Sequence, residues 1–191
     1  MTRVRRAGAA VVIGGLLVAG CSSDGGDAEL TVGAPGGAGP DAPEVVTSLP
    51  PPSGPVDTTT ACGTITAAEV GQVVGNTVRA GAGAETFCSW GTAVDRGTSV
   101  HLTVVRPAPG RVAQACESQR NSQPKEANHA PVDNVGTSGL WVWQPLALLL
   151  QGTLVTCWEN SVVVVGVTGE KDQAVLRNQA VALAKAVHQR L

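Results

Sequence analysis

The cysteines of this 191-residue chain constrain its fold more than any other feature of the sequence. One of the five ends an apolar run near the N-terminus, and the others are spread widely, at Cys62, Cys88, Cys116 and Cys157. None of these four lies two to four residues from another, so the spacing fits neither a structural zinc site nor a Cys-x-x-Cys redox pair. An even number of cysteines outside the cytoplasm predicts disulfides, and four cysteines allow three pairings.

The N-terminal segment predicts where the chain is located. Residues 1–20 carry three arginines and no acid, and their apolar run is shorter than the roughly 20 residues that span a bilayer. This is the pattern of a signal peptide. The run ends in Val18-Ala19-Gly20-Cys21, which resembles the lipobox of bacterial lipoproteins. We therefore expect a diacylglyceryl group with acyl chains such as palmitate on Cys21, which anchors the mature protein to the extracytoplasmic face of the cell membrane. The alternative is an ordinary secretory peptide that contains a cysteine.

Residues 21–60 have the composition of a tether. They are rich in Gly, Ala, Pro, Ser and Thr, and they carry six acids with no Lys or Arg. So few large apolar residues cannot bury enough surface to offset the entropy lost on ordering, which predicts disorder. As a flexible coil this segment has an end-to-end distance of roughly 30–40 Å. The folded domain is therefore expected over residues 61–191.

The charge of residues 61–191 argues against nucleic acid as a partner. This part of the chain holds ten Lys and Arg against nine Asp and Glu. A nucleic-acid-binding domain carries a basic patch or stripe, and none is visible here.

The hydrophobic pattern of residues 61–191 predicts an α+β domain. Thr66-Ala67-Ala68-Glu69 is a capping box that starts a short helix, which Gly75 ends. Consecutive strands joined by short turns pair antiparallel, so we expect a sheet of five to six strands with two or three helices packed on it. The remaining predicted elements are strands at 86–90, 99–105, 140–143, 146–151, 154–158 and 162–167, helices at 110–119 and 170–190, and a loop at 121–131.

Three details of this prediction can be checked directly. The all-apolar runs 146–150 and 162–165 predict central strands that are covered on both faces. Turns are expected at Gln151-Gly152, at Glu159-Asn160 and around Asp95-Arg96-Gly97.

The favoured disulfides are Cys62–Cys88 and Cys116–Cys157. Each would join a helical segment to a strand in which a tryptophan, Trp90 or Trp158, closely follows the cysteine. Chain-entropy arithmetic gives about 3.5 and about 4 kcal/mol for loops of these lengths.

The segment Cys62-Gly63-Thr64-Ile65-Thr66-Ala67-Ala68-Glu69-Val70, followed by Cys88-Ser89-Trp90, resembles the opening of a family of actinobacterial lipoproteins known only as a domain of unknown function. The second cysteine pair and the C-terminal amphipathic helix fit that family as well. The resemblance implies a surface lipoprotein with no established activity. Two-disulfide extracellular sensor domains have a similar fold and are the alternative.

The sequence shows no catalytic or metal-binding constellation and implies no cofactor. His101, His129 and His188 lie apart from one another and from any recognisable nucleophile, so we interpret them as exposed or structural. Trp141 and Trp143 lie on one face of a strand, where they either line a groove for a glycan, lipid or peptide, or pack against the C-terminal helix, which we favour.

These observations predict a lipid-anchored, non-enzymatic domain that binds a ligand or another envelope protein. The alternatives are a small cell-wall hydrolase or modifying enzyme and a structural component of an envelope complex. The missing nucleophile, base and metal ligands disfavour the enzyme.

Overall fold

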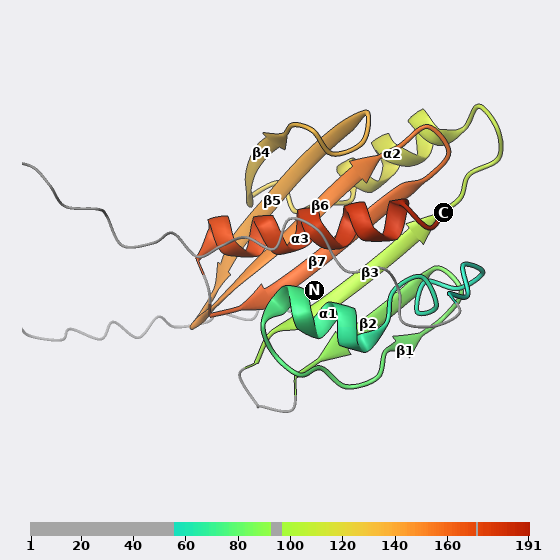
Figure 1. Cartoon of the computed structure of the whole chain (residues 1–191). Coiled ribbons are helices and arrows are strands. Elements are labelled where there is room, and N and C mark those ends of the chain that lie inside the picture. Colours follow the sequence, from blue (N-terminus) through green and yellow to red (C-terminus); the bar gives the residue numbers. More distant parts are fainter. Residues whose placement is uncertain (1–55, 93–96, 171) are drawn as a thin grey trace, which may run out of the picture. The chain divides into compact units, whose positions relative to one another are not determined.

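A computed structural model of the chain describes residues 56–92, 97–170 and 172–191, which form three helices and one seven-stranded antiparallel sheet (Figure 1). The predicted signal peptide, Cys21 and most of the predicted tether lie outside these residues, as do two residues of the turn expected at 95–97. The elements are α1 (Ala67–Val74), β1 (Ala82–Gly83), β2 (Phe87–Gly91), β3 (Ser99–Val105), α2 (Val112–Asn121), β4 (Asn128–Val132), β5 (Ser138–Leu146), β6 (Leu149–Cys157), β7 (Val162–Gly169) and α3 (Gln173–His188).

The predicted α+β class is confirmed, but the sheet has more strands than the five to six expected. Its strand order is β1-β2-β3-β7-β6-β5-β4. All but the last residue of strand β4 lies in the segment 121–131 that was predicted to be a loop, because the polar residues and Pro131 hide the strand. Since β4 is at the edge of the sheet, it can accommodate a proline, which lacks the N–H of other residues.

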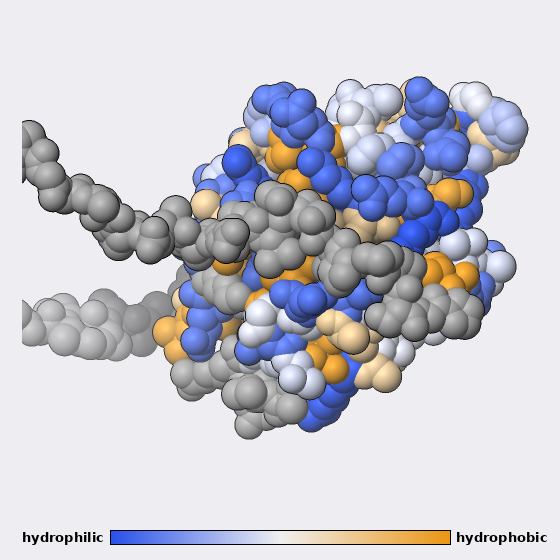
Figure 2. All heavy atoms as spheres, in the orientation of Figure 1, coloured by the Kyte–Doolittle hydropathy of each residue, from blue (hydrophilic) through white to orange (hydrophobic). Residues whose placement is uncertain are grey.

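The β5–β6 hairpin differs from the prediction in its register and in its exposure. The turn falls at Ala147 and Leu148, where Ala147 has a left-handed backbone with φ of 51°, so the predicted turn at Gln151-Gly152 is wrong. The run 146–150 is consequently the tip of a hairpin, and the prediction of a covered central strand there is also wrong. Leu146 is 42% exposed and Leu148 is 70% exposed. Figure 2 shows apolar surface at the end of the sheet where this hairpin turns.

Strand β7 is the centre of the sheet and is covered on both faces, as predicted for 162–165. Its side chains alternate between two apolar clusters. Val163, Val165 and Val167 belong to the main core, which also contains buried residues of α1 and α3. Val162 and Val164 belong to a smaller cluster with residues of α2. Helices α1 and α3 therefore lie on one face of the sheet, and α2 lies alone on the other (Figure 1).

The predicted capping box starts α1. The Glu69 amide donates to the Thr66 hydroxyl, while the Thr66 amide donates to the Glu69 carboxylate over 2.8 Å. Gly75 ends the helix with a left-handed backbone. The same carboxylate pairs with Arg190 after the end of α3, over 2.5 Å, and both side chains are nearly buried. One glutamate therefore caps α1 and joins it to the C-terminal segment.

Both favoured disulfides are confirmed. Cys62 is bonded to Cys88 on β2, which places one bridge within the main core. Cys116 on α2 is bonded to Cys157 at the end of β6, on the opposite face of the sheet.

A close approach at Gly152 gives the first testable prediction. A methyl group at this position would overlap the ring of Trp141, which is fully buried. We expect Gly152→Ala to lower the free energy of unfolding by roughly 3 kcal/mol, the upper end of the cost of overpacking a core. Urea unfolding followed by tryptophan fluorescence measures the change.

Gly166 on β7 provides the matched control. A methyl group there would meet its nearest neighbour, the Cβ of His101, at an ordinary distance of 3.5 Å. Gly166→Ala should leave stability unchanged or raise it by about 0.4–1 kcal/mol through the unfolded state. Equal losses for the two variants would contradict the packing described for Trp141.

Candidate functional site

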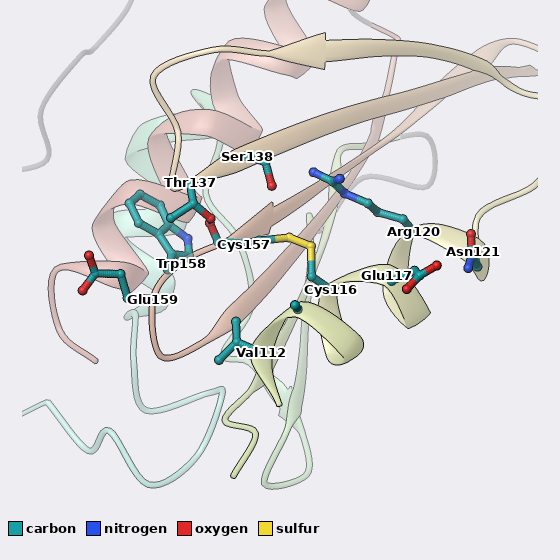
Figure 3. Close-up of a pocket in the computed structure, with 11 residues that line it drawn as sticks. Val112, Cys116, Glu117, Arg120, Asn121, Thr137, Ser138, Cys157, Trp158 and Glu159 are labelled. Carbon is teal, nitrogen blue, oxygen red and sulfur yellow. A yellow bond between two sulfur atoms is a disulfide. The ribbon is translucent and has the colours of Figure 1, made fainter. Parts of the chain in front are cut away.

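A hollow formed by described residues lies beside α2. It has a volume of about 580 Å³ and is bounded by α2, by the start of β5 and by the end of β6 with the turn that follows (Figure 3). The Cys116–Cys157 disulfide forms part of its wall. Ligand pockets in proteins commonly have volumes of 300–1,000 Å³, so this hollow has room for a small organic molecule.

Helix α2 is held on the sheet by few contacts. Cys116 is its one buried residue, and Val112 and Ala115 pack beside it against Val155 and Val162. Ala113, between Val112 and the disulfide, is exposed. No side chain caps the start of the helix. The disulfide is therefore the main constraint on this wall of the hollow.

Arg120 projects from the last turn of α2 into the hollow. Figure 3 shows its guanidinium pointing from the helix toward Ser138 on β5. Its Nε is buried without a hydrogen-bond partner, and within the described residues its side chain forms no ion pair. A cation in the last turn of a helix gains about 0.3–1 kcal/mol from the helix dipole. That gain explains why a cation occurs at this position. It does not explain why the guanidinium is directed across the sheet with its Nε buried.

A second hollow adjoins the first at Arg120. It has a volume of about 500 Å³, and Arg120 and Asn121 line both hollows. Lys125 and His129 are its other charged or titratable residues, and no acid lines it. Glu117 and Glu159 line the first hollow instead. The two hollows therefore form one groove with a basic end and an end that contains two carboxylates.

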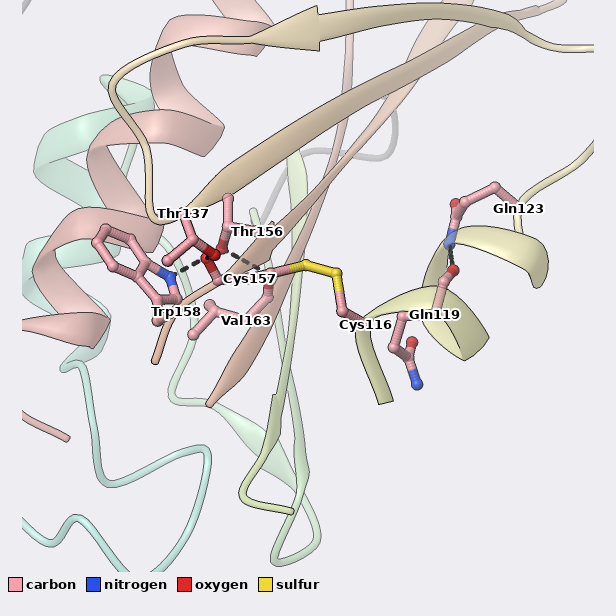
Figure 4. Close-up of a disulfide and its surroundings, with 8 residues drawn as sticks. All are labelled: Cys116, Gln119, Gln123, Thr137, Thr156, Cys157, Trp158 and Val163. Carbon is pink, nitrogen blue, oxygen red and sulfur yellow. Dashed lines mark hydrogen bonds between the residues drawn. A yellow bond between two sulfur atoms is a disulfide. The ribbon is translucent and has the colours of Figure 1, made fainter. Parts of the chain in front are cut away.

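Trp158 anchors the wall opposite α2 through hydrogen bonds. Its indole N–H donates to the Thr156 hydroxyl over 3.1 Å, and that hydroxyl donates to the Val163 carbonyl over 2.9 Å (Figure 4). The Thr137 hydroxyl donates to the Cys157 carbonyl over 2.9 Å. On the side of α3 the indole stacks on His188, with ring centroids 3.7 Å apart. The position of Trp158 is fixed on both sides, so this wall is preformed.

His188 gives a pH-dependent prediction. Burial against Trp158 lowers the pKa of His188 below its usual 6.5, although Glu159 acts in the opposite direction. Because the folded state disfavours the protonated ring, the stability from the neutral stacked ring is fully present above pH 6.5. It is lost as the pH falls through the lower pKa of the folded state. His101 contributes in the same direction, because burial also lowers its pKa.

His188→Phe keeps an aromatic ring on Trp158 but cannot be protonated. We expect its free energy of unfolding to fall less than that of the unaltered chain when urea unfolding is measured at pH 7.5, 6.5 and 5.5. His129→Phe is the control, since His129 is exposed and its ring contacts the Pro124 carbonyl. Identical pH profiles for the unaltered chain and His188→Phe would contradict the prediction.

Of the remaining candidates from the sequence, only His129 lines this groove. Trp141 is fully buried in the core with residues of α3, and Trp143, on the same face, is half-buried. A fully buried indole offers a ligand no surface, so Trp141 packs in the core with the C-terminal helix, the arrangement that we favoured, and does not line a groove. His101 stacks on Phe87 with ring centroids 5.9 Å apart, and His129 lines the basic hollow.

The sequence alone did not identify Arg120 as a candidate. Residues 110–119 were predicted to be helical, and an arginine at the end of such a helix usually interacts with solvent and the helix dipole. Arg120 becomes a candidate only when the part of the sheet beneath α2 is known, and the disulfide determines where α2 lies on the sheet. One sequence feature could have indicated this site. The helix has few apolar residues and carries a cysteine that was expected to pair, so a disulfide was expected to hold it on the sheet.

The described residues contain no group of three or more His, Cys, Asp or Glu placed to hold a metal ion. Among the same residues, no helix has the length and apolar character needed to cross a membrane. A scan against protein-family models finds no match for this chain, and a search of curated proteins finds no relative.

Proposed function

We propose that this chain is a lipid-anchored, non-enzymatic domain on the extracytoplasmic face of the cell membrane, and that it binds a small ligand in the groove beside α2. The two disulfides support an oxidising compartment. The lipobox-like sequence at Cys21 supports the anchor, and the composition of the following residues supports a tether.

The hollow of about 580 Å³ carries the binding part of this proposal. Its walls are held by a disulfide on one side and by the Trp158 hydrogen bonds on the other, so little ordering is needed when a ligand enters. No histidine lines it among the described residues, and the Thr137 hydroxyl already donates to a carbonyl. Binding therefore accounts for the groove better than nucleophilic catalysis does.

The anchor is tested by expressing the chain and its Cys21→Ala variant in the same host. The unaltered protein should enter the membrane fraction, partition into detergent and gain the mass of a diacylglyceryl group on its first peptide. Cys21→Ala should do none of these. Equal partitioning of the two proteins would overturn the lipoprotein assignment and leave the groove unaffected.

Ligand binding is tested by native mass spectrometry of the protein purified gently from its own membranes. Ala113→Trp should fill the hollow, because Ala113 lines it, and should abolish any bound mass. Gln114→Trp is the control, since Gln114 is the next residue on the same helix and lies outside the lining. A bound mass that survives Ala113→Trp would place the ligand elsewhere.

One observation favours a second function, contact with another envelope protein. Leu146 and Leu148 expose apolar surface at the tip of the β5–β6 hairpin, where a solvent-facing turn is usually polar. A photo-crosslinker at position 148 should then yield one discrete adduct in cells, and the same crosslinker at exposed position 114 should not. A lack of adducts from position 148 would remove this candidate.

A further inference from the structure

We propose that the groove beside α2 binds the anionic oxygen group of its ligand, a carboxylate or a phosphate, between Arg120 and Lys125. This inference rests on the proposed ligand-binding function and specifies the chemical class of the ligand. It follows from the state of the Arg120 side chain and from the distribution of charge along the groove.

Among the residues that the structure describes, Arg120 has no counterion. Its Nε is enclosed and makes no hydrogen bond, so part of the hydration of the guanidinium has been lost without replacement. A carboxylate is available nearby in sequence, because Glu117 lies three residues earlier on the same helix. The two side chains nevertheless form no ion pair, and Figure 3 shows Arg120 directed toward β5, away from the Glu117 carboxylate. The guanidinium is therefore left for a group that enters the groove.

The arrangement of charges indicates which end of the groove receives the anion. Arg120 lies where the two hollows meet. The hollow on one side adds Lys125 and His129 and has no acid in its lining. The hollow on the other side adds Glu117 and Glu159, which repel an anion. The anionic group is thus placed on the Lys125 side of Arg120, and the rest of the ligand extends into the larger hollow.

The donors near Arg120 suit an oxyanion rather than a halide. A guanidinium presents its N–H groups as a planar fork that matches two oxygens of a carboxylate or phosphate. The Ser138 hydroxyl, toward which the guanidinium points, lines the larger hollow and adds a neutral donor. With two cations at the site, a doubly charged anion should bind more tightly than a singly charged one.

The test uses the whole chain carrying Cys21→Ala, which cannot receive lipid, labelled with ¹⁵N for NMR. Sodium phosphate, succinate and acetate are titrated separately at constant ionic strength, with chloride as the reference anion. We expect saturable shifts of the Arg120 Nε–H signal and of the amides of residues 120–129. Phosphate or succinate should bind at least tenfold more tightly than acetate, and the tighter of the two identifies the oxyanion.

Arg120→Gln should weaken binding at least tenfold, and Lys125→Gln should weaken it severalfold. Arg111→Gln is the matched control, because Arg111 precedes the same helix, is exposed and donates a side-chain hydrogen bond to Gln114. Equal shifts with chloride, or unchanged binding by Arg120→Gln, would overturn the anion assignment. A bound native ligand that Ala113→Trp displaces but Arg120→Gln does not would retain the proposed function while refuting this inference.

Discussion

Glu69→Ala should lower the free energy of unfolding by about 3–5 kcal/mol, the usual cost of removing one partner of a buried ion pair. The carboxylate accepts two hydrogen bonds from Arg190 and one from the Thr66 amide, so the substitution uncaps α1 and leaves Arg190 buried without a counterion. A loss of this size lowers the melting temperature of such a domain by roughly 10 °C or more. Differential scanning calorimetry measures it directly.

The same carboxylate makes the stability of the domain depend on pH in the acid range. Burial raises the pKa of Glu69, but hydrogen bonds from Arg190 and Thr66 and the charge of Arg190 outweigh it, so the pKa lies below its usual 4.5. Its stabilising contribution is complete above pH 4.5 and is lost as the pH falls through the lower pKa of the folded state. Glu85→Ala is the control, since Glu85 is exposed, and it should change stability by no more than about 0.5 kcal/mol. Similar losses for both variants would refute the role of the pair.

Replacing Cys116 and Cys157 together with alanine should have a comparable effect on stability and a larger effect on the groove. The bridge closes a loop with a sequence separation of 41 residues, which corresponds to about 4 kcal/mol in the chain-entropy model. Because α2 has few other apolar contacts, we expect the helix to detach from the sheet while the main core persists. Hydrogen exchange should then accelerate in residues 112–121 far more than in β7.

The Cys62–Cys88 disulfide provides a control that separates the effect on stability from the effect on the groove. Replacing Cys62 and Cys88 with alanine removes about 3.5 kcal/mol in the same model, but from the opposite face of the sheet. Anion binding at Arg120 should survive in this variant below its melting temperature and should be absent without Cys116–Cys157. If both variants bind equally, the disulfide beside α2 does not hold the wall of the groove.

The sequence predicted correctly those elements whose boundaries are determined by residues close to them in the chain. The Thr66–Glu69 capping box, the buried stripe of α3 and the apolar run of β7 are each complete within a few turns or residues. The β5–β6 hairpin could not be predicted in this way. An apolar run such as 146–150 has the same pattern whether it is buried or exposed, and only the pairing of β5 with β6, in which Leu146 lies opposite Leu149, shows where the chain turns.

The candidate site was predictable only in part. Cysteine spacing indicated that α2 is tied to the end of β6, and this bridge forms one wall of the groove. Arg120 and Lys125 line one hollow together with His129 of β4 and Leu140 of β5, which pair at the sheet edge, and β4 was hidden by Pro131. A tryptophan pair suggested a binding face because it is unusual in composition. One of its members instead fills the space above Gly152.

The position of β7 has a consequence for how the chain is made. This strand is the last in sequence but the middle one in the sheet, and it joins β3, whose last residue Val105 pairs with Val162, to β6. A nascent chain that ends before Val162 therefore consists of two strand groups, each with an uncovered apolar edge, and α3 is not yet available to cover them. Folding must therefore wait until nearly the whole chain is available, because the pairing of β7 with β3 and β6 joins segments far apart in sequence.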